Sequence, residues 1–165
     1  MNQPAVLPKS PAQPGRAEAF AERVSDIVNL GAVAVMLSIG HRTGLLAAMA
    51  GRPAAGSAAI AASAGLAERY VREWLAALVT AGIVEYEPGT ATYRLPDEHA
   101  ACLVPGGALG NLAVYAQHVA LMGQMQERII ECFRTGAGTR YEEYPHFHHM
   151  MAEDSGQTVV AQLRE

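Results

Sequence analysis

The chain has 165 residues, half of them hydrophobic but only 6% aromatic, and its formal net charge is -4. This length accommodates one domain with helical additions, and the abundance of alanine favours helix over a large aromatic core. The acidic balance argues against broad affinity for nucleic acid, which requires a basic surface. Charged residues make up only 17%, below the usual quarter or so, so we expect some apolar helix faces to meet a partner.

The N-terminal segment, residues 1–15, contains four prolines and little apolar sequence. It is typical of a disordered proline-rich tail and lacks the apolar stretch of a secretion signal. The longest apolar run, 32–39, is too short to span a bilayer. Cys102 and Cys132 lack metal-ligand spacing and indicate small buried side chains in a reducing compartment. We therefore expect a cytoplasmic protein with no membrane association.

The first structured segment has a helical pattern. Apolar residues recur at steps of three and four from 16 to 39, which predicts a long helix. Gly40 and Gly44 interrupt the pattern, so we expect this helix to end near residue 39 and a short one to cover 43–50. Gly51 and the following proline end this block.

The next segment has the order helix, tight turn, helix, hairpin. Ser57 is placed as the N-cap of a short helix over 58–64. A second helix, 68–81, carries one apolar stripe. Residues 83–86 and 92–95 alternate in polarity around a proline–glycine turn, as hairpin strands do. The stripe of the second helix is made by Tyr70, Val71, Trp74, Leu75, Leu78 and Val79. This order predicts a winged helix-turn-helix.

The remaining segment is also helical. A short helix follows the wing up to about residue 104, and a long helix is predicted over 108–133. The glycines from 106 to 110 follow no strand, and we interpret them as the start of that long helix. A last helix is expected from Pro145 into 159–163, because proline is tolerated at a first helical position.

The predicted fold class is therefore mainly α: a winged helix-turn-helix with a small hairpin wing, flanked by long dimerisation-type helices. The predicted division is a tail at 1–15, N-terminal helices with the winged helix at 16–104, and a helical extension at 105–165. The long helices, 16–39 and 108–133, offer more apolar stripe than a small winged helix can cover. A homodimer would bury it.

A winged helix raises the possibility of DNA binding, for which Arg69 and Arg72 are the candidate residues. Glu68 and Glu73 on the same helix cancel their charge, and the wing adds one cation, Arg94, against more carboxylates. DNA recognition requires cations facing the phosphates. Charge therefore favours a winged helix that contacts protein, and a small transcription regulator is the alternative function.

Several runs carry a resemblance to a known family. Residues 65–86, 93–100 and 133–136 resemble the N-terminal winged-helix region of bacterial class I S-adenosylmethionine-dependent methyltransferases. The resemblance covers nearly all of the chain after the tail and is most specific over 65–100. It implies a dimerisation and substrate-capping region beside a catalytic domain, with a small-molecule methyl acceptor.

The run 147–155 resembles the helix that precedes the catalytic domain of small-molecule O-methyltransferases. That resemblance implies that Phe147 and Met151 line the edge of the acceptor and cofactor pocket; core packing is the other role open to them. Their spacing of four puts both on one helix face. His148 stands where the family often has asparagine.

The family's cofactor domain opens with a strand and a glycine-rich turn, which let the backbone approach the ligand closely. No such arrangement is present in the sequence. We expect no complete active site and no cofactor in this chain, although S-adenosylmethionine is implied for the full-length family.

The histidines near the C-terminus suggest a weaker alternative. His146 and His149 would share a helix face, a spacing that two metal-ligating imidazoles can use. A solvated helix start explains them as well. His41, His99 and His118 are isolated in the sequence, and His118 is expected to be a buried, hydrogen-bonded residue.

Overall fold

The computed structural model describes residues 15–162, and the side chains of residues 15–156. The predicted tail, apart from its last residue, and the final residues 163–165 lie outside this range. The described chain divides into two units between Gly31 and Ala32, and each is described separately.

Helix α1 (Arg16–Arg42) runs through both units. Its first part is the described portion of the N-terminal unit, where apolar side chains are exposed because a lone helix cannot cover them. They include Phe20, Val24, Ile27, Val28 and Leu30. By length and composition alone α1 could cross a membrane, contrary to the inference from the shorter run 32–39. Its last turns instead belong to a folded core: Ser38 is 2% exposed and Gly40 is buried.

The prediction that the first helix ends near residue 39 is wrong. The helix continues through Gly40, and Gly44, with φ of 76°, precedes the next helix, α2 (Leu45–Met49). Gly40 serves close packing, since a Cβ there would lie 2.5 Å from Cζ2 of Trp74. Glycine at position 40 therefore allows close contact with Trp74, whereas glycine at position 44 allows a left-handed backbone.

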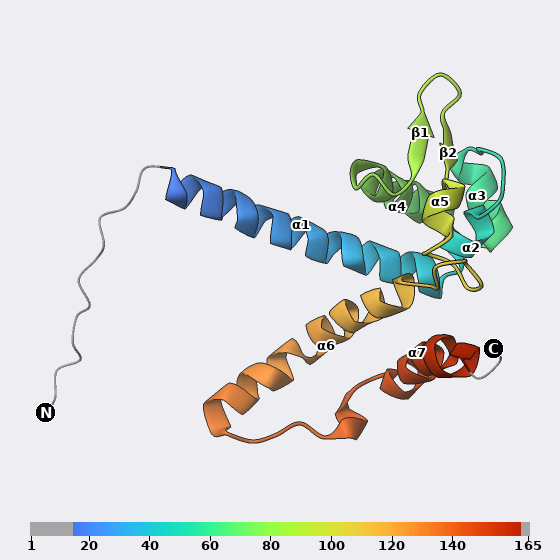
Figure 1. Cartoon of the computed structure of the whole chain (residues 1–165). Coiled ribbons are helices and arrows are strands. Elements are labelled where there is room, and N and C mark those ends of the chain that lie inside the picture. Colours follow the sequence, from blue (N-terminus) through green and yellow to red (C-terminus); the bar gives the residue numbers. More distant parts are fainter. Residues whose placement is uncertain (1–14, 163–165) are drawn as a thin grey trace, which may run out of the picture. The chain divides into compact units, whose positions relative to one another are not determined.

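The winged helix follows in the expected order (Figure 1). Helix α3 (Ser57–Ala64) contacts both α2 and helix α4 (Glu68–Thr80). The wing is an antiparallel pair, β1 (Glu85–Glu87) and β2 (Thr92–Arg94), with Tyr86 opposite Tyr93. The mainly α fold with a two-stranded wing is thus confirmed.

Several boundaries differ from prediction for local reasons. The predicted N-cap, Ser57, is the first residue of α3, and its hydroxyl donates to Oε1 of Glu68 (2.7 Å). The first wing strand begins at Glu85 rather than 83, because the N–H groups of Ile83 and Val84 both donate to the carbonyl of Leu78. Tyr70 was expected in the apolar stripe of α4 but is 73% exposed.

The core joins the winged helix to the end of α1. The largest fully buried side chains include Leu46, Leu75, Leu78 and Leu95. Trp74 is 4% exposed, and its indole N–H donates to the carbonyl of Met36 (2.8 Å). This bond satisfies the polar atom of a buried ring.

The segment after the wing contains a structured loop in place of a predicted helix start. Helix α5 (Asp97–Ala100) is short, and α6 (Ala113–Thr135) begins five residues later than predicted. The loop bends at Gly106 and Gly110, both with positive φ. Its N–H groups at Leu109 and Leu112 donate to the carbonyls of Ala101 and Cys102. These bonds place the glycine-rich run outside the helix.

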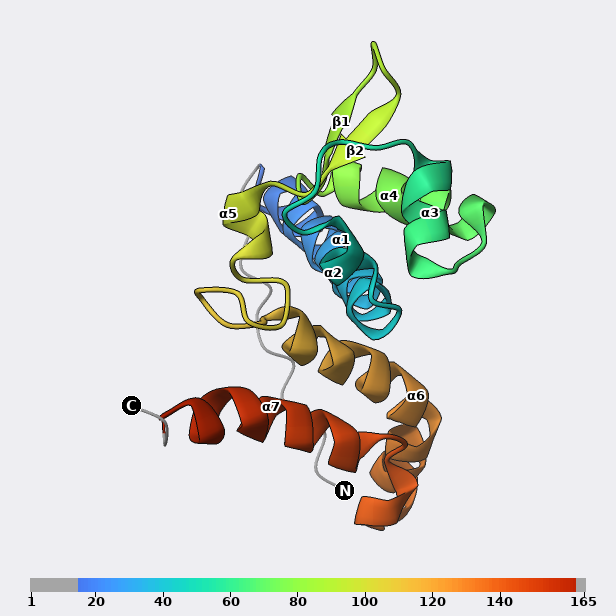
Figure 2. The same ribbon diagram turned by 90° about the vertical axis from the view of Figure 1, so that its right-hand side faces the viewer.

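Helices α6 and α7 (Phe147–Gln162) contact each other, and Figure 2 shows them side by side. The last helix begins two residues after Pro145, because His146 has a φ of 61° and is not helical. Its extension to residue 162 agrees with the prediction. A 3-10 turn, η1 (Tyr141–Glu143), lies between them.

Arg128 ties this connection to α6. Its Nε donates to Oε2 of Glu143 (2.6 Å) and its Nη2 to the carbonyl of Gly138 (2.8 Å), while Nη1 lies 3.3 Å from the Cys132 sulfur. The hydrogen bond from Arg128, with one from the Arg140 backbone N–H, lowers the pKa of Glu143 below its ordinary value.

Replacing Arg128 with alanine should release the segment between α6 and α7 without unfolding the core. We expect severalfold faster limited proteolysis between residues 136 and 146, mapped by mass spectrometry. Arg128→Lys should not restore protection, since an ammonium cannot make the forked contact. Cleavage at the wild-type rate in Arg128→Ala would show that the hydrogen bonds of Arg128 do not order this segment.

One face of α6 stays exposed although it is apolar. It consists of Leu112, which directly precedes the helix, and of four residues within it, Tyr115, Val119, Met122 and Phe133. The first four follow one another at steps of three or four, and Phe133 lies eleven residues after Met122. The opposite side carries the buried residues Val114, Leu121 and Met125. We call this exposed set the α6 stripe.

Candidate functional site

A chain of polar side chains links the end of α1, the start of α6 and the middle of α7. Asn111, 3% exposed, accepts a hydrogen bond at Oδ1 from the N–H of Ala113 (3.2 Å). Its Nδ2 lies 3.2 Å from Nδ1 of His41. The Nε2 of the same imidazole lies 3.3 Å from Oε2 of Glu153. Residues 41, 111 and 153 therefore form one connected network.

The donors in this network determine the hydrogen-bonding roles of the two His41 nitrogens. A backbone N–H can only donate, so Oδ1 of Asn111 faces Ala113 and the amide NH2 faces His41. An NH2 group cannot accept, so Nδ1 of His41 is the acceptor in that contact. Nε2 faces the carboxylate of Glu153, which can only accept, so Nε2 donates to it.

Glu153 is the acceptor at the centre of the network. Its Oε2 also accepts from Nε2 of Gln117 (2.8 Å), and its Oε1 lies 3.5 Å from His149. Burial raises the pKa of Glu153, but hydrogen bonds from Gln117 and His41, together with Coulomb attraction to His41 and His149, outweigh burial and leave the pKa below its ordinary value. Glu153 is therefore ionised at neutral pH.

Replacing Glu153 with alanine should cost roughly 1–3 kcal/mol of unfolding free energy, because the buried Gln117 amide loses its acceptor. A lowered folded-state pKa contributes stability above the unfolded value of about 4.3 and loses it as pH falls through the folded value. The difference between wild type and Glu153→Ala should therefore shrink below about pH 4. Urea unfolding at neutral and acidic pH measures this difference in unfolding free energy. A difference that did not change with pH would contradict the role of the ionised Glu153 carboxylate.

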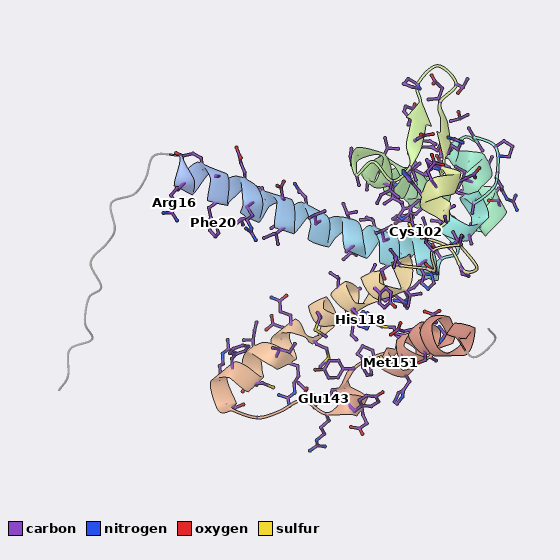
Figure 3. The ribbon with its side chains drawn as sticks, viewed as in Figure 1. Arg16, Phe20, Cys102, His118, Glu143 and Met151 are labelled. Carbon is purple, nitrogen blue, oxygen red and sulfur yellow. The ribbon has the colours of Figure 1, made fainter. Side chains whose placement is uncertain are left out.

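The predicted pocket-edge residues lie at the start of α7. Phe147 is half-buried, with its ring centroid 5.0 Å from that of Tyr141 in an edge-on contact. His148 is exposed and lies 4.6 Å from the same ring. Met151, labelled in Figure 3, is 38% exposed. Neither Phe147 nor Met151 is enclosed as a core residue would be, and their role at a pocket edge stays a prediction.

A second bond joins these helices. The hydroxyl of Tyr115 on α6 donates to Oδ1 of Asp154 on α7 (2.8 Å). This hydrogen bond to a carboxylate raises the pKa of Tyr115. With Gln117–Glu153, it fixes which side of α7 faces α6.

The histidine pair suggested for a metal is not arranged as expected. His146 precedes α7 and has a left-handed backbone, so it does not share a helical face with His149. His149 pairs with Glu153. Among the side chains of residues 15–156, no group of three or more histidine, cysteine, aspartate or glutamate residues is placed to hold a metal ion.

The candidate DNA-contacting residues lie on the exposed side of α4. Arg69 is exposed, whereas Nη1 of Arg72 lies 3.4 Å from Oε1 of Glu68. In the wing, Arg94 donates twice to Glu85 (3.0 and 3.1 Å). Two of the cations that would meet phosphates are thus already paired with carboxylates.

The sequence did not reveal the polar network. His41 and His99 stand alone in the sequence, but in the structure His41 contacts Asn111 and Glu153, and Nδ1 of His99 donates to the carbonyl of Ile83 (2.9 Å). His118 was expected to be buried; it is half-buried and bonds within α6. Gln117, a polar residue among the buried positions of α6, was the one available signal.

Comparison with known proteins agrees with this architecture. Residues 31–104 match the family model of the Rv2258c-like winged HTH domain, in agreement with the winged-helix architecture of this segment. No curated protein matches the chain.

Solved structures extend the match beyond the winged helix. Human N-acetylserotonin methyltransferase, solved with SAM, matches with a TM-score of 0.60 and 18% identity over 82% of this chain and 41% of its own. The mitomycin 7-O-methyltransferase MmcR matches with a TM-score of 0.56 and 20% identity, over 74% of this chain and 36% of its own. PigF, solved with SAH, matches with a TM-score of 0.51 and 19% identity, over 81% of this chain and 39% of its own. The chain has the fold of the N-terminal region of SAM-dependent O-methyltransferases, and it spans about two fifths of their length.

Proposed function

We propose that this chain is the dimerisation and substrate-capping portion of a SAM-dependent methyltransferase-like protein of the bacterial cytoplasm, and that it is not catalytically competent alone. The observation that supports it best is the combination of the methyltransferase N-terminal fold with the exposed α6 stripe. Apolar side chains at steps of three and four form a seam that a second helix can cover. In this proposal a second copy covers it.

The capping role rests on the exposed start of α7. Phe147 and Met151 present an aromatic ring and a flexible thioether from one face of the helix. Such side chains suit the apolar part of a methyl acceptor. The chemistry and the SAM site would be supplied outside the described residues.

The cofactor part of the proposal is tested by titrating the 165-residue chain with SAM in a calorimeter. We expect no saturable heat. Saturable binding of SAM would overturn the assignment of a cap without its own cofactor site.

The dimer is tested by light scattering during size exclusion at micromolar concentration, where we expect twice the mass of one chain. Val119→Glu places a charge in the α6 stripe and should give a monomer. Gln124→Glu adds the same charge at an exposed position outside the stripe and should stay dimeric. A monomeric wild-type chain would overturn this proposal.

The alternative of a transcription regulator has weaker support, because the paired arginines leave little free positive charge on α4 and the wing. A gel-shift assay would support it if the chain bound duplex DNA in a salt-sensitive way that Arg69→Ala with Arg72→Ala abolished.

A further inference from the structure

A small cavity opens beside the polar network. Its volume is about 230 Å³, smaller than a drug-sized site but sufficient for a compact organic molecule. The described lining residues come from the end of α1, the loop before α6, α6 itself and α7: His41, Pro105, Gly106, Asn111, Val114 and Glu153. Buried polar groups and apolar walls thus meet in one concave place.

One acidic side chain lines this cavity. Glu153 is the carboxylate among its described lining residues. The carboxylate receives hydrogen bonds from Gln117 and His41, and no lysine or arginine is among its described ion-pair partners. His149, on the same helix, is the other titratable group beside it, and its side chain is 74% exposed.

The lining restricts the kind of ligand. An ionised carboxylate can only accept hydrogen bonds, so it favours a donor and repels an anion. Pro105 is exposed and offers apolar surface for a compact body. A hydrogen bond between ammonium and carboxylate is roughly twice as strong as one between neutral groups. A small cation with an apolar body matches both features.

We propose that this cavity binds a small organic ammonium ion, with its N–H groups on Glu153 and its apolar part against Pro105. The site differs from the proposed acceptor edge: Glu153 follows Met151 by two residues, which turns it to about the opposite side of the helix. The inference does not depend on the methyltransferase proposal.

Three probes of similar shape and different charge test it: phenethylammonium, 2-phenylethanol and 3-phenylpropionate. Each is titrated into the isotope-labelled 165-residue chain and followed by NMR. Phenethylammonium should cause saturable shifts at Val114, Gly106 and Asn111, and phenylpropionate none. The wild-type chain alone can overturn the proposal. Either phenylpropionate would bind as tightly as phenethylammonium, or phenethylammonium would cause no saturable shift.

Two matched variants test whether the carboxylate of Glu153 binds the ammonium ion. Glu153→Gln keeps the side-chain shape and should weaken phenethylammonium binding roughly tenfold or more. Glu127→Gln removes the same charge from an exposed position on α6 outside the cavity and should leave binding unchanged. Equal weakening in both variants would show attraction to the net charge of the chain and would overturn the site.

Discussion

Replacing Trp74 with alanine is expected to lower the unfolding free energy by about 3–5 kcal/mol. The ring is 4% exposed and lies against Gly40, where α1 has no side chain. Its N–H also holds the carbonyl of Met36. The change therefore opens a cavity and removes a bond between the winged helix and α1.

Urea unfolding followed by circular dichroism measures this loss, since the variant has no tryptophan to follow by fluorescence. Tyr70→Ala is the control: it removes an aromatic ring from the same helix, but one that is 73% exposed, and should change stability by less than about 0.5 kcal/mol. Similar losses in the two variants would show that Trp74 does not join α1 to the core.

Replacing Gly107 with alanine should destabilise the chain by roughly 1–3 kcal/mol through overpacking. The added Cβ would lie 2.4 Å from the carbonyl oxygen of Ala101 and 2.8 Å from its carbonyl carbon. Both are backbone atoms that cannot rotate away. The loop that delivers Asn111 to His41 would have to shift.

Gly123→Ala is the matched control, because a Cβ at Gly123 meets nothing within 4 Å. In the interior of α6 it should increase stability by up to about 1 kcal/mol. The two substitutions add the same methyl group and should have opposite signs in thermal unfolding. A neutral Gly107→Ala would contradict the tight loop.

Much of the fold could be predicted because its signals are local. The apolar stripe of α4 and the alternation around the wing follow from neighbouring residues, and both elements form as expected. Gly40 and the run 106–110 misled the prediction, because glycine marks close packing in one case and a loop in the other. Only tertiary contacts distinguish these roles from a helix end or a helix start.

The candidate site could be predicted only in part for the same reason. Phe147 and Met151 follow from a motif within one helix, whereas His41 and Glu153 are 112 positions apart. Nothing in a single sequence pairs residues at that distance. The orientation of the Asn111 amide toward His41 depends further on an N–H at Ala113, which has no side-chain signature at all.

The short wing also affects how the protein behaves in crowded solution. The inner strand, β2, is flanked by β1 and by a bridge between Ala55 and Tyr93, so β1 forms the outer edge of this sheet in the described chain. An open edge can recruit strands from other molecules and start aggregation. Here it is three residues long and begins and ends with a glutamate, Glu85 and Glu87. Glu85 is paired with Arg94, whereas Glu87 keeps a carboxylate on this edge. The wing therefore discourages intermolecular strand pairing chiefly by its shortness, with Glu87 adding some charge repulsion.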